Sequence, residues 1–211
     1  MLKPKLRRSV LDPHRGFTDE DVPQVTRKVA ALFRQLHEVL GVNLNDPNSK
    51  ETPERAAKAY VNEFFGGLNV DKFPKMTVFP NTRKINEIVL LTIDHFESHC
   101  SHHWAPFMGC AWVGYIPADK VLGASKFSRL FDFFAARPQI QENLTSDVAD
   151  CLEDLLKPKG LGVVVEATHT CMSGRGVKKH GKMMTAAMRG VFMSKPAARK
   201  EFYDLITIAR N

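Results

Sequence analysis

The sequence predicts an α+β fold: an antiparallel four-stranded sheet with two helices on one face, preceded by an N-terminal helical region. Two observations carry this prediction. Apolar residues repeat with a helical period early in the chain, and the later β-like segments come in two pairs that enclose two helical segments. Strands paired in this way around a central helix pair are typical of an antiparallel sheet covered on one face. The length of 211 residues suits one such unit with a helical extension.

The N-terminal helical region contains two predicted helices. Residues 18–40 place apolar side chains at a 3.6-residue period, with Thr18 as the expected N-cap and Gly41 as the stop signal. The second helix is expected to open at Thr52, followed by a proline in the first helical position, and to end at Gly66.

Prolines mark the boundary between this region and the sheet. Pro74 and Pro80 break any regular pattern over residues 72–85. We therefore expect a basic flexible tail at residues 1–17, a helical region at 18–80 and the sheet-containing unit at 81–211. The predicted elements of that unit are strands at 86–96 and 109–116, helices at 125–134 and 146–156, strands at 162–169 and 183–192, and a last helix at 197–206.

Composition narrows the class of partner. A hydrophobic fraction of 44% and a charged fraction of 25% are ordinary for a soluble globular protein. No apolar run reaches the ~20 residues needed to span a bilayer, and the N-terminus lacks the apolar core of a secretory signal, so we expect a cytoplasmic protein with no membrane partner. The net charge of +7 favours an anionic partner. Because no helix-turn-helix, RNP-like or zinc-knuckle pattern is present, we expect a phosphorylated small molecule rather than nucleic acid.

Cysteines and histidines in two short segments predict a metal site. Cys100 and His103 form a Cys-x-x-His pair that also includes His102, and His169 and Cys171 lie two residues apart at the end of a predicted strand, on the same face. These two thiols and three imidazoles can hold one zinc ion through three protein atoms and leave two histidines for proton transfer.

The two remaining cysteines bear on whether that site is open. Cys110 as a fourth thiolate would give a closed, structural zinc site. We favour a packing role for it, because it begins a strand that leads away from the ligand turn. Cys151 falls on the apolar face of a predicted helix and is expected in the core.

Basic residues cluster at positions suited to a polyphosphate. Ser125 and Lys126 open a predicted helix with Arg129 one turn later, so the two cations share a face near the positive helix N-terminus. Further cations with similar spacing or in a flexible turn are Arg55, Lys58 and Arg175. A base would need a carboxylate that accepts two parallel N–H groups, and Glu142 next to Gln141 is the best candidate.

Taken in order along the chain, these motifs resemble the GTP cyclohydrolase I family. The resemblance lies in a Cys-x-His-His-x-x-Pro turn, then Gly-Tyr-Ile-Pro, Ser-Lys-x-x-Arg, Gln-x-Gln-Glu, Thr-His-x-Cys and Arg-Gly, and it extends from about residue 25 to the C-terminus. Here these motifs are residues 100–106, 114–117, 125–129, 139–142, 168–171 and 175–176, and residues 52–58 are similar to the family's second helix.

The resemblance implies a reaction and an assembly. The reaction is hydrolysis of GTP at C8 to formate and 7,8-dihydroneopterin triphosphate, a first step toward pterins such as tetrahydrofolate. The implied architecture is the tunnelling fold, in a homodecamer of two stacked pentamers with active sites at subunit interfaces. Shared sheet edges between subunits would also cover the exposed strand edges.

The resemblance also assigns roles to residues. It implies that Zn²⁺ is held by Cys100, His103 and Cys171, and that His102 and His169 transfer protons as the imidazole ring of guanine opens. The implied GTP-binding residues are Glu142 for the guanine edge, with Gln141 and Ser125 nearby, and Lys126, Arg129 and Arg175 for the triphosphate, supported by Arg55 and Lys58.

Three positions depart from the family pattern. Ser101 stands where Glu is usual, Cys110 where Lys is common and Asn143 where Arg is common. None removes an implied zinc ligand or catalytic histidine, so they bear on rate and metal affinity more than on reaction type. The alternatives are a zinc-bound paralogue that binds purine nucleotide without turnover, as a regulatory or structural subunit, and a basic nucleic-acid-binding protein whose closed structural zinc site includes Cys110.

Overall fold

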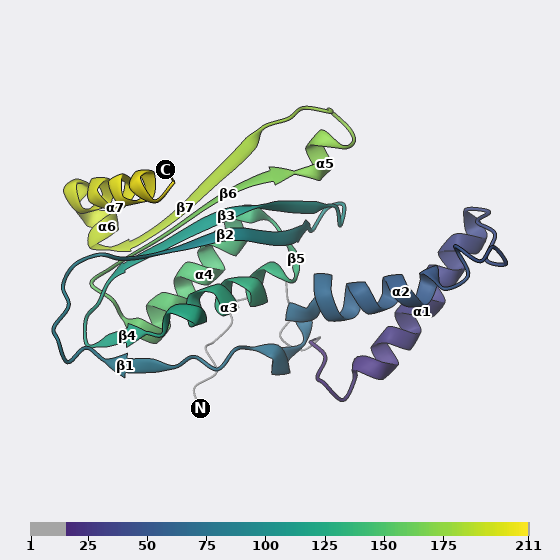
Figure 1. Cartoon of the computed structure of the whole chain (residues 1–211), viewed down its shortest axis with the longest axis horizontal. Helices are drawn as coiled ribbons and strands as arrows, with labels where there is room; N and C mark the ends of the chain where they lie inside the picture. The colour runs from purple at the N-terminus through teal and green to yellow at the C-terminus, as the bar shows by residue number, and fades with distance from the viewer. Residues whose placement is uncertain (1–15, 211) are drawn as a thin grey trace. The chain divides into compact units, whose positions relative to one another are not determined.

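The computed structural model describes residues 16–210, which form two compact units, residues 16–73 and residues 74–210 (Figure 1). Residues 1–15, with most of the predicted basic tail, lie outside the described residues. No helix within residues 16–210 has the length and apolar character needed to cross a bilayer.

The first unit is helical, as the apolar periodicity predicts. It contains α1 (Val22–Val39) and α2 (Thr52–Ala59), and α2 continues into a π-helical turn at Tyr60–Phe64. The expected N-cap at Thr18 is wrong: its backbone N–H and hydroxyl both donate to the carboxylate of Asp21, at 2.9 and 2.8 Å, in a turn that precedes the helix. Two short 3₁₀ helices, Gly66–Leu68 and Val70–Lys72, complete the unit.

The second unit is built on a mixed sheet of five strands in the order β5-β2-β3-β6-β7. Four of these strands run antiparallel, namely β2 (Val89–Cys100), β3 (Pro106–Ile116), β6 (Gly160–His169) and β7 (Lys182–Gly190). The α+β class is therefore confirmed. The sequence did not predict the short edge strand β5 (Pro138–Gln139), which runs parallel to β2, nor the separate ribbon of β1 (Val78–Pro80) and β4 (Lys120–Leu122).

Helices cover the sheet on both faces (Figure 1). The predicted helix pair, α3 (Ala124–Ala135) and α4 (Gln141–Leu156), packs on one face. On the other face lie α6 (Val191–Ser194) and α7 (Pro196–Ala209), which close a small core around Phe202. The chain needs glycine at positions 114 and 162 for this packing, because a Cβ atom at either would meet the Phe202 ring at 2.4 or 2.5 Å.

Helix α4 begins five residues before the predicted start at residue 146. The buried side chains among its first five residues are Gln141, Leu144 and Thr145, two of which are polar. The apolar period therefore begins only at Leu144, and the pattern missed the first residues of the helix. This early start places Gln141 and Glu142 at the end of the sheet where β5 pairs with Cys100.

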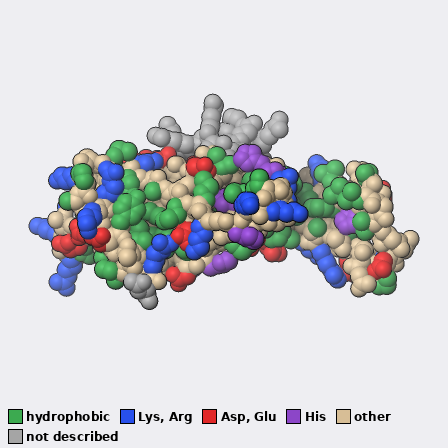
Figure 2. Space-filling view, turned by 90° about the horizontal axis from the view of Figure 1, so that it is seen from above, with side chains coloured by type: hydrophobic (Ala, Val, Ile, Leu, Met, Phe, Trp, Pro, Cys, Tyr) green, Lys and Arg blue, Asp and Glu red, His purple; other side chains and the backbone are tan. Residues whose placement is uncertain are grey.

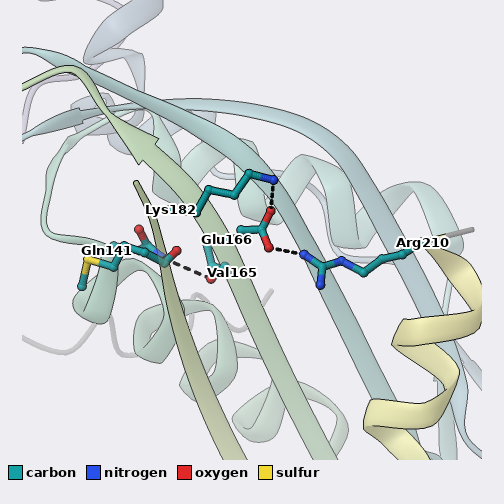
Figure 3. Close-up of polar contacts among 6 residues, drawn as sticks. Gln141, Val165, Glu166, Lys182 and Arg210 are labelled. Atoms are coloured by element: carbon teal, nitrogen blue, oxygen red, sulfur yellow. Dashed lines mark hydrogen bonds and ion pairs between the residues drawn. The ribbon is translucent and has the colours of Figure 1, made fainter. Parts of the chain in front are cut away.

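A buried carboxylate ties α7 to the sheet (Figure 3). Glu166 on β6 accepts hydrogen bonds from Lys182, at 2.7 Å, and from Arg210, whose guanidinium also lies 4.7 Å from the Trp112 ring centroid. Its side chain is only 9% exposed. The hydrogen bond from Lys182, more than that from Arg210, holds the pKa of Glu166 below its usual 4.5. The carboxylate is thus stabilised in its charged form.

We expect Glu166→Gln to lower the free energy of unfolding at pH 7 by roughly 1–2 kcal/mol, since charged hydrogen bonds are lost but both cations remain partly exposed and can rehydrate. Because the folded-state pKa is depressed, this contribution is complete above pH ~4.5 and is lost as the pH falls through the folded pKa. Urea unfolding of both proteins at pH 7 and at pH 3.5, at equal protein concentration, tests this. A difference that does not shrink in acid would contradict it.

Candidate metal centre

The turn between β2 and β3 presents the first pair of candidate ligands. Its ends are joined by a hydrogen bond from the Cys100 N–H to the Ala105 carbonyl, at 2.9 Å. Trp104 adopts a φ of 54° and donates its N–H to the Cys100 carbonyl, at 2.8 Å. The tight turn leaves Cys100 buried at the end of the strand, while His102 and His103 are exposed beside it. A thiol is therefore held rigidly beneath two accessible imidazoles.

The second pair comes from the end of β6 and the short helix α5 (Thr170–Ser173). The hydroxyl of Thr170 donates to the Pro106 carbonyl at 2.6 Å. Phe107 and His169 are opposite each other in the ladder, with rings stacked at 4.6 Å and an interplanar angle of 6°. These contacts fasten the end of β6 to the start of β3, which brings Cys171 beside Cys100.

Three of the predicted ligands meet at this point. The ligand atoms of Cys100, His103 and Cys171 all lie within 4.8 Å of one another, and within residues 16–210 no other group of three or more His, Cys, Asp or Glu residues is arranged in this way. Cys110 is outside the group and pairs with Glu166 in the β3–β6 ladder. A three-residue donor set leaves a coordination position free, as in catalytic rather than structural zinc sites.

The electrostatics of the two thiols suit a cation. Burial, and then the neighbouring Cys100 sulfur, raise the pKa of Cys171 above its usual 9.0. Two thiolates this close repel each other unless a positive charge lies between them. Sulfur and imidazole donors are those that Zn²⁺ prefers, so the donor set fits that ion.

Two histidines remain beside this group. His102 is exposed, and its Nδ1 lies 3.5 Å from the Cys100 sulfur. His169 is half-buried, and this burial lowers its pKa below 6.5, opposed by the negative charge of Glu142. Figure 2 shows histidine, Lys and Arg side chains gathered over the end of the sheet that carries α5.

The structure brings some of the predicted GTP-binding residues to this end of the sheet. Glu142 is exposed at the start of α4, and its negative charge raises the pKa of His169 against the effect of burial. Arg175 follows α5, and its positive charge lowers the pKa of Cys171 against the effect of burial. Gln141 lies here too, but its side chain is 1% exposed and its polar atoms are paired within the protein. The sequence predicts Gln141 near the guanine edge. These bonds occupy its amide within the protein, and its part in GTP binding stays a prediction.

Three of the predicted GTP-binding residues lie at the other end of the sheet. Ser125, Lys126 and Arg129 are in the first turns of α3, which begins at the far end of the sheet, where β3 ends at Ile116 (Figure 1). The eleven residues of β3 separate that end from the metal-binding group, or about 35 Å at ~3.3 Å per residue. Arg55 and Lys58 belong to the helical unit, where both are exposed and Arg55 pairs with Glu51 at 2.6 Å.

Sequence reasoning missed Phe107 as part of the site, and it placed Gln141 there without predicting its bond to His169. Phe107 stacks on His169, and Gln141 bonds to its ring. Both contacts join segments that are distant in the sequence, β3 and α4 with the end of β6, and a local hydrophobic pattern does not say which residues of such segments meet.

Fold and site together define a class: an α+β protein with an open Cys₂His metal-binding group and further histidines beside it, the arrangement of a metal-dependent catalyst. The family model described as GTP cyclohydrolase I matches residues 29–207. The chain therefore belongs to the GTP cyclohydrolase I family.

Individual relatives agree with this assignment. The chain is 37% identical to GTP cyclohydrolase 1 of Wigglesworthia glossinidia brevipalpis, over 93% of this chain and 91% of the relative. It is 41% identical to the Aeromonas salmonicida protein of the same name, over 85% and 83% of the two chains. The Vibrio cholerae protein of that name is also 41% identical, over 83% of this chain and 81% of the relative.

Proposed function

We propose that this protein is a zinc-dependent GTP cyclohydrolase I, which hydrolyses GTP at C8 and releases formate and 7,8-dihydroneopterin triphosphate in the cytoplasm. The observation that carries the proposal is the convergence of Cys100, His103 and Cys171 beside two further histidines, in a chain of this family. A structural zinc site would have no use for His102 and His169.

The metal is assigned from the donor set. Cys100 and Cys171 supply thiolates and His103 an imidazole, a combination suited to Zn²⁺ with one position left for water. When bound, the ion supplies Lewis acidity that brings the pKa of a coordinated water close to neutrality.

The chain's own residues bind the substrate and move its protons. Glu142, exposed at the start of α4, accepts hydrogen bonds from two parallel N–H groups on the guanine edge, and these bonds orient the base toward the metal centre. His102, exposed beside the metal-binding group, donates a proton to the ring nitrogen that leaves when the imidazole ring opens. His169 assists later proton transfers, and Arg175 binds phosphate.

The remaining phosphate ligands come from a second copy. Ser125 and Lys126 lie at the start of α3, at the end of the sheet that the length of β3, about 35 Å, separates from the metal-binding group of the same chain. One nucleotide is too short to join these two ends, and Arg129 follows one turn later on the same helix. An assembly that places the α3 start of one subunit against the metal centre of the next completes the site. We therefore propose a homo-oligomer, a decamer of two pentamers with the tunnelling fold, in which Arg55 and Lys58 add to the triphosphate site.

Incubation of the purified protein with GTP tests this function. We expect formate and a product that fluoresces as neopterin triphosphate after oxidation, both abolished by a zinc chelator and restored by added Zn²⁺. Product at a useful rate would also show that Ser101 is tolerated where Glu is usual. Metal-replete protein that binds GTP but releases no formate would instead establish a nucleotide-binding paralogue.

A further inference from the structure

The buried Gln141 side chain bridges β6, β7 and His169. Its Nε2 lies 3.1 Å from the carbonyl oxygen of Val165 (Figure 3) and 3.0 Å from that of Met183. The hydroxyl of Thr185, at 3.2 Å, shares the two amide protons with these carbonyls. Its Oε1 lies 2.8 Å from Nε2 of His169. Such a residue is placed to orient a neighbouring ring rather than to meet a ligand.

The amide can take only one orientation in these surroundings. Two of its partners are carbonyl oxygens, which only accept, so the NH₂ group must face them. The two neighbouring hydroxyls are consistent with this orientation. Thr145 donates its proton to the main-chain carbonyl of Gln141, at 2.7 Å, so the proton in the 2.6 Å bond between Thr145 and Thr185 comes from Thr185. The Thr185 oxygen is then free to accept from the amide. Oε1 therefore faces His169 as an acceptor.

An acceptor at this place determines where the histidine carries its proton. A neutral imidazole has one N–H and one bare nitrogen, and a carbonyl oxygen 2.8 Å away requires the N–H at Nε2. Nδ1 then keeps its lone pair, and it makes no hydrogen bond to any residue between 16 and 210. Stacking on Phe107 fixes the ring plane as well.

We propose that Gln141 is a positioning residue, which holds His169 as the Nε2–H tautomer and leaves Nδ1 as the atom available to accept a proton from the substrate. This inference rests on the proposed function, because it supposes that His169 acts on GTP. Gln141 thereby contributes to the reaction through His169 rather than through a contact of its own with GTP.

The wild-type protein offers the first test. In zinc-loaded protein labelled with ¹⁵N-histidine, with His169 assigned by comparison with His169→Ala, we expect a slowly exchanging proton on Nε2 and an unprotonated Nδ1. A proton on Nδ1 would overturn the proposal. This measurement needs no Gln141 variant and remains decisive if such a variant does not fold.

A pair of variants separates positioning from stability. Gln141→Met keeps the length of the side chain but removes its acceptor, so we expect kcat to fall by about 10- to 100-fold with KM for GTP unchanged, and the slowly exchanging Nε2 proton to disappear. Thr185→Val is the matched control, because it removes a bond of the same network on the side away from His169. It should lower the unfolding temperature yet keep kcat near wild type.

The outcomes distinguish the two claims. Equal losses of kcat in both variants would reduce Gln141 to a structural role and overturn the inference, while wild-type turnover of GTP would leave the proposed function standing. If the wild-type protein did not convert GTP, the proposed function would fall, although the tautomer measurement would still report the orientation of His169.

Discussion

Replacing Cys171 with alanine is expected to remove zinc from the protein and to abolish turnover of GTP. Cys171 is one of only three ligand residues in the group, and two remaining donors, Cys100 and His103, make a poor zinc site. Loss of the ion forfeits several kcal/mol of transition-state stabilisation, so kcat should fall by more than about 10³-fold. Zinc content by elemental analysis and formate release, measured on the same preparation, test both parts.

Cys110→Ala provides the matched control. This cysteine lies on β3 outside the metal-binding group, and its pKa is raised by burial and then by the charge of Glu166. Its removal should leave both zinc content and turnover intact. If Cys110→Ala lost the metal while Cys171→Ala kept it, the metal would not be bound by the group proposed here. That result would favour the alternative of a nucleic-acid-binding protein whose closed structural zinc site includes Cys110.

The metal centre could be predicted from sequence because its residues are close to one another along the chain. Cys100 and His103 share one turn, and His169 and Cys171 share one strand end, so only the meeting of two short segments had to be inferred. The antiparallel ladder of β3 and β6 supplies that meeting, since it places Phe107 opposite His169.

The support of the site could not be predicted in the same way. Nothing in the sequence marks Gln141 as buried, because it is polar and precedes the helix predicted at residues 146–156, yet its side chain is buried. What allows the burial is a set of acceptors from β6, β7 and Thr185, distant in sequence and brought together only by register. Pattern rules that assign polar residues to the surface fail where a hydrogen-bond network satisfies the buried group.

For the predicted phosphate-binding residues, the sequence predicts the helix but not its place on the sheet. Lys126 and Arg129 were correctly expected on one helix start, but sequence spacing says nothing about which end of the sheet that helix occupies. The connection through β4 begins α3 at the end opposite the metal centre. A site that needs both ends requires two chains, and so the fold of one chain leads to the assembly proposed above.

The two adjacent histidines of the β2–β3 turn should separate cleanly by mutation. His102 and His103 are both exposed on the same turn, so alanine at either position should affect folding alike. Only His103 belongs to the metal-binding group. We therefore expect His103→Ala to lose zinc and activity together, whereas His102→Ala keeps its zinc and loses about 10²- to 10⁴-fold in kcat, the range for removal of a general acid.

The distances from the two imidazoles to the Cys100 sulfur do not by themselves identify the metal ligand. Nδ1 of His102 is closer to the Cys100 sulfur, at 3.5 Å, than Nδ1 of His103, at 4.0 Å, so proximity to one thiol alone would favour the wrong histidine. What selects His103 is that it reaches both sulfurs at once. Zinc lost from His102→Ala and retained in His103→Ala would reverse the two roles. Zinc retained with full activity in His102→Ala would remove His102 from the chemistry and leave His169, held by Gln141, as the histidine that moves protons.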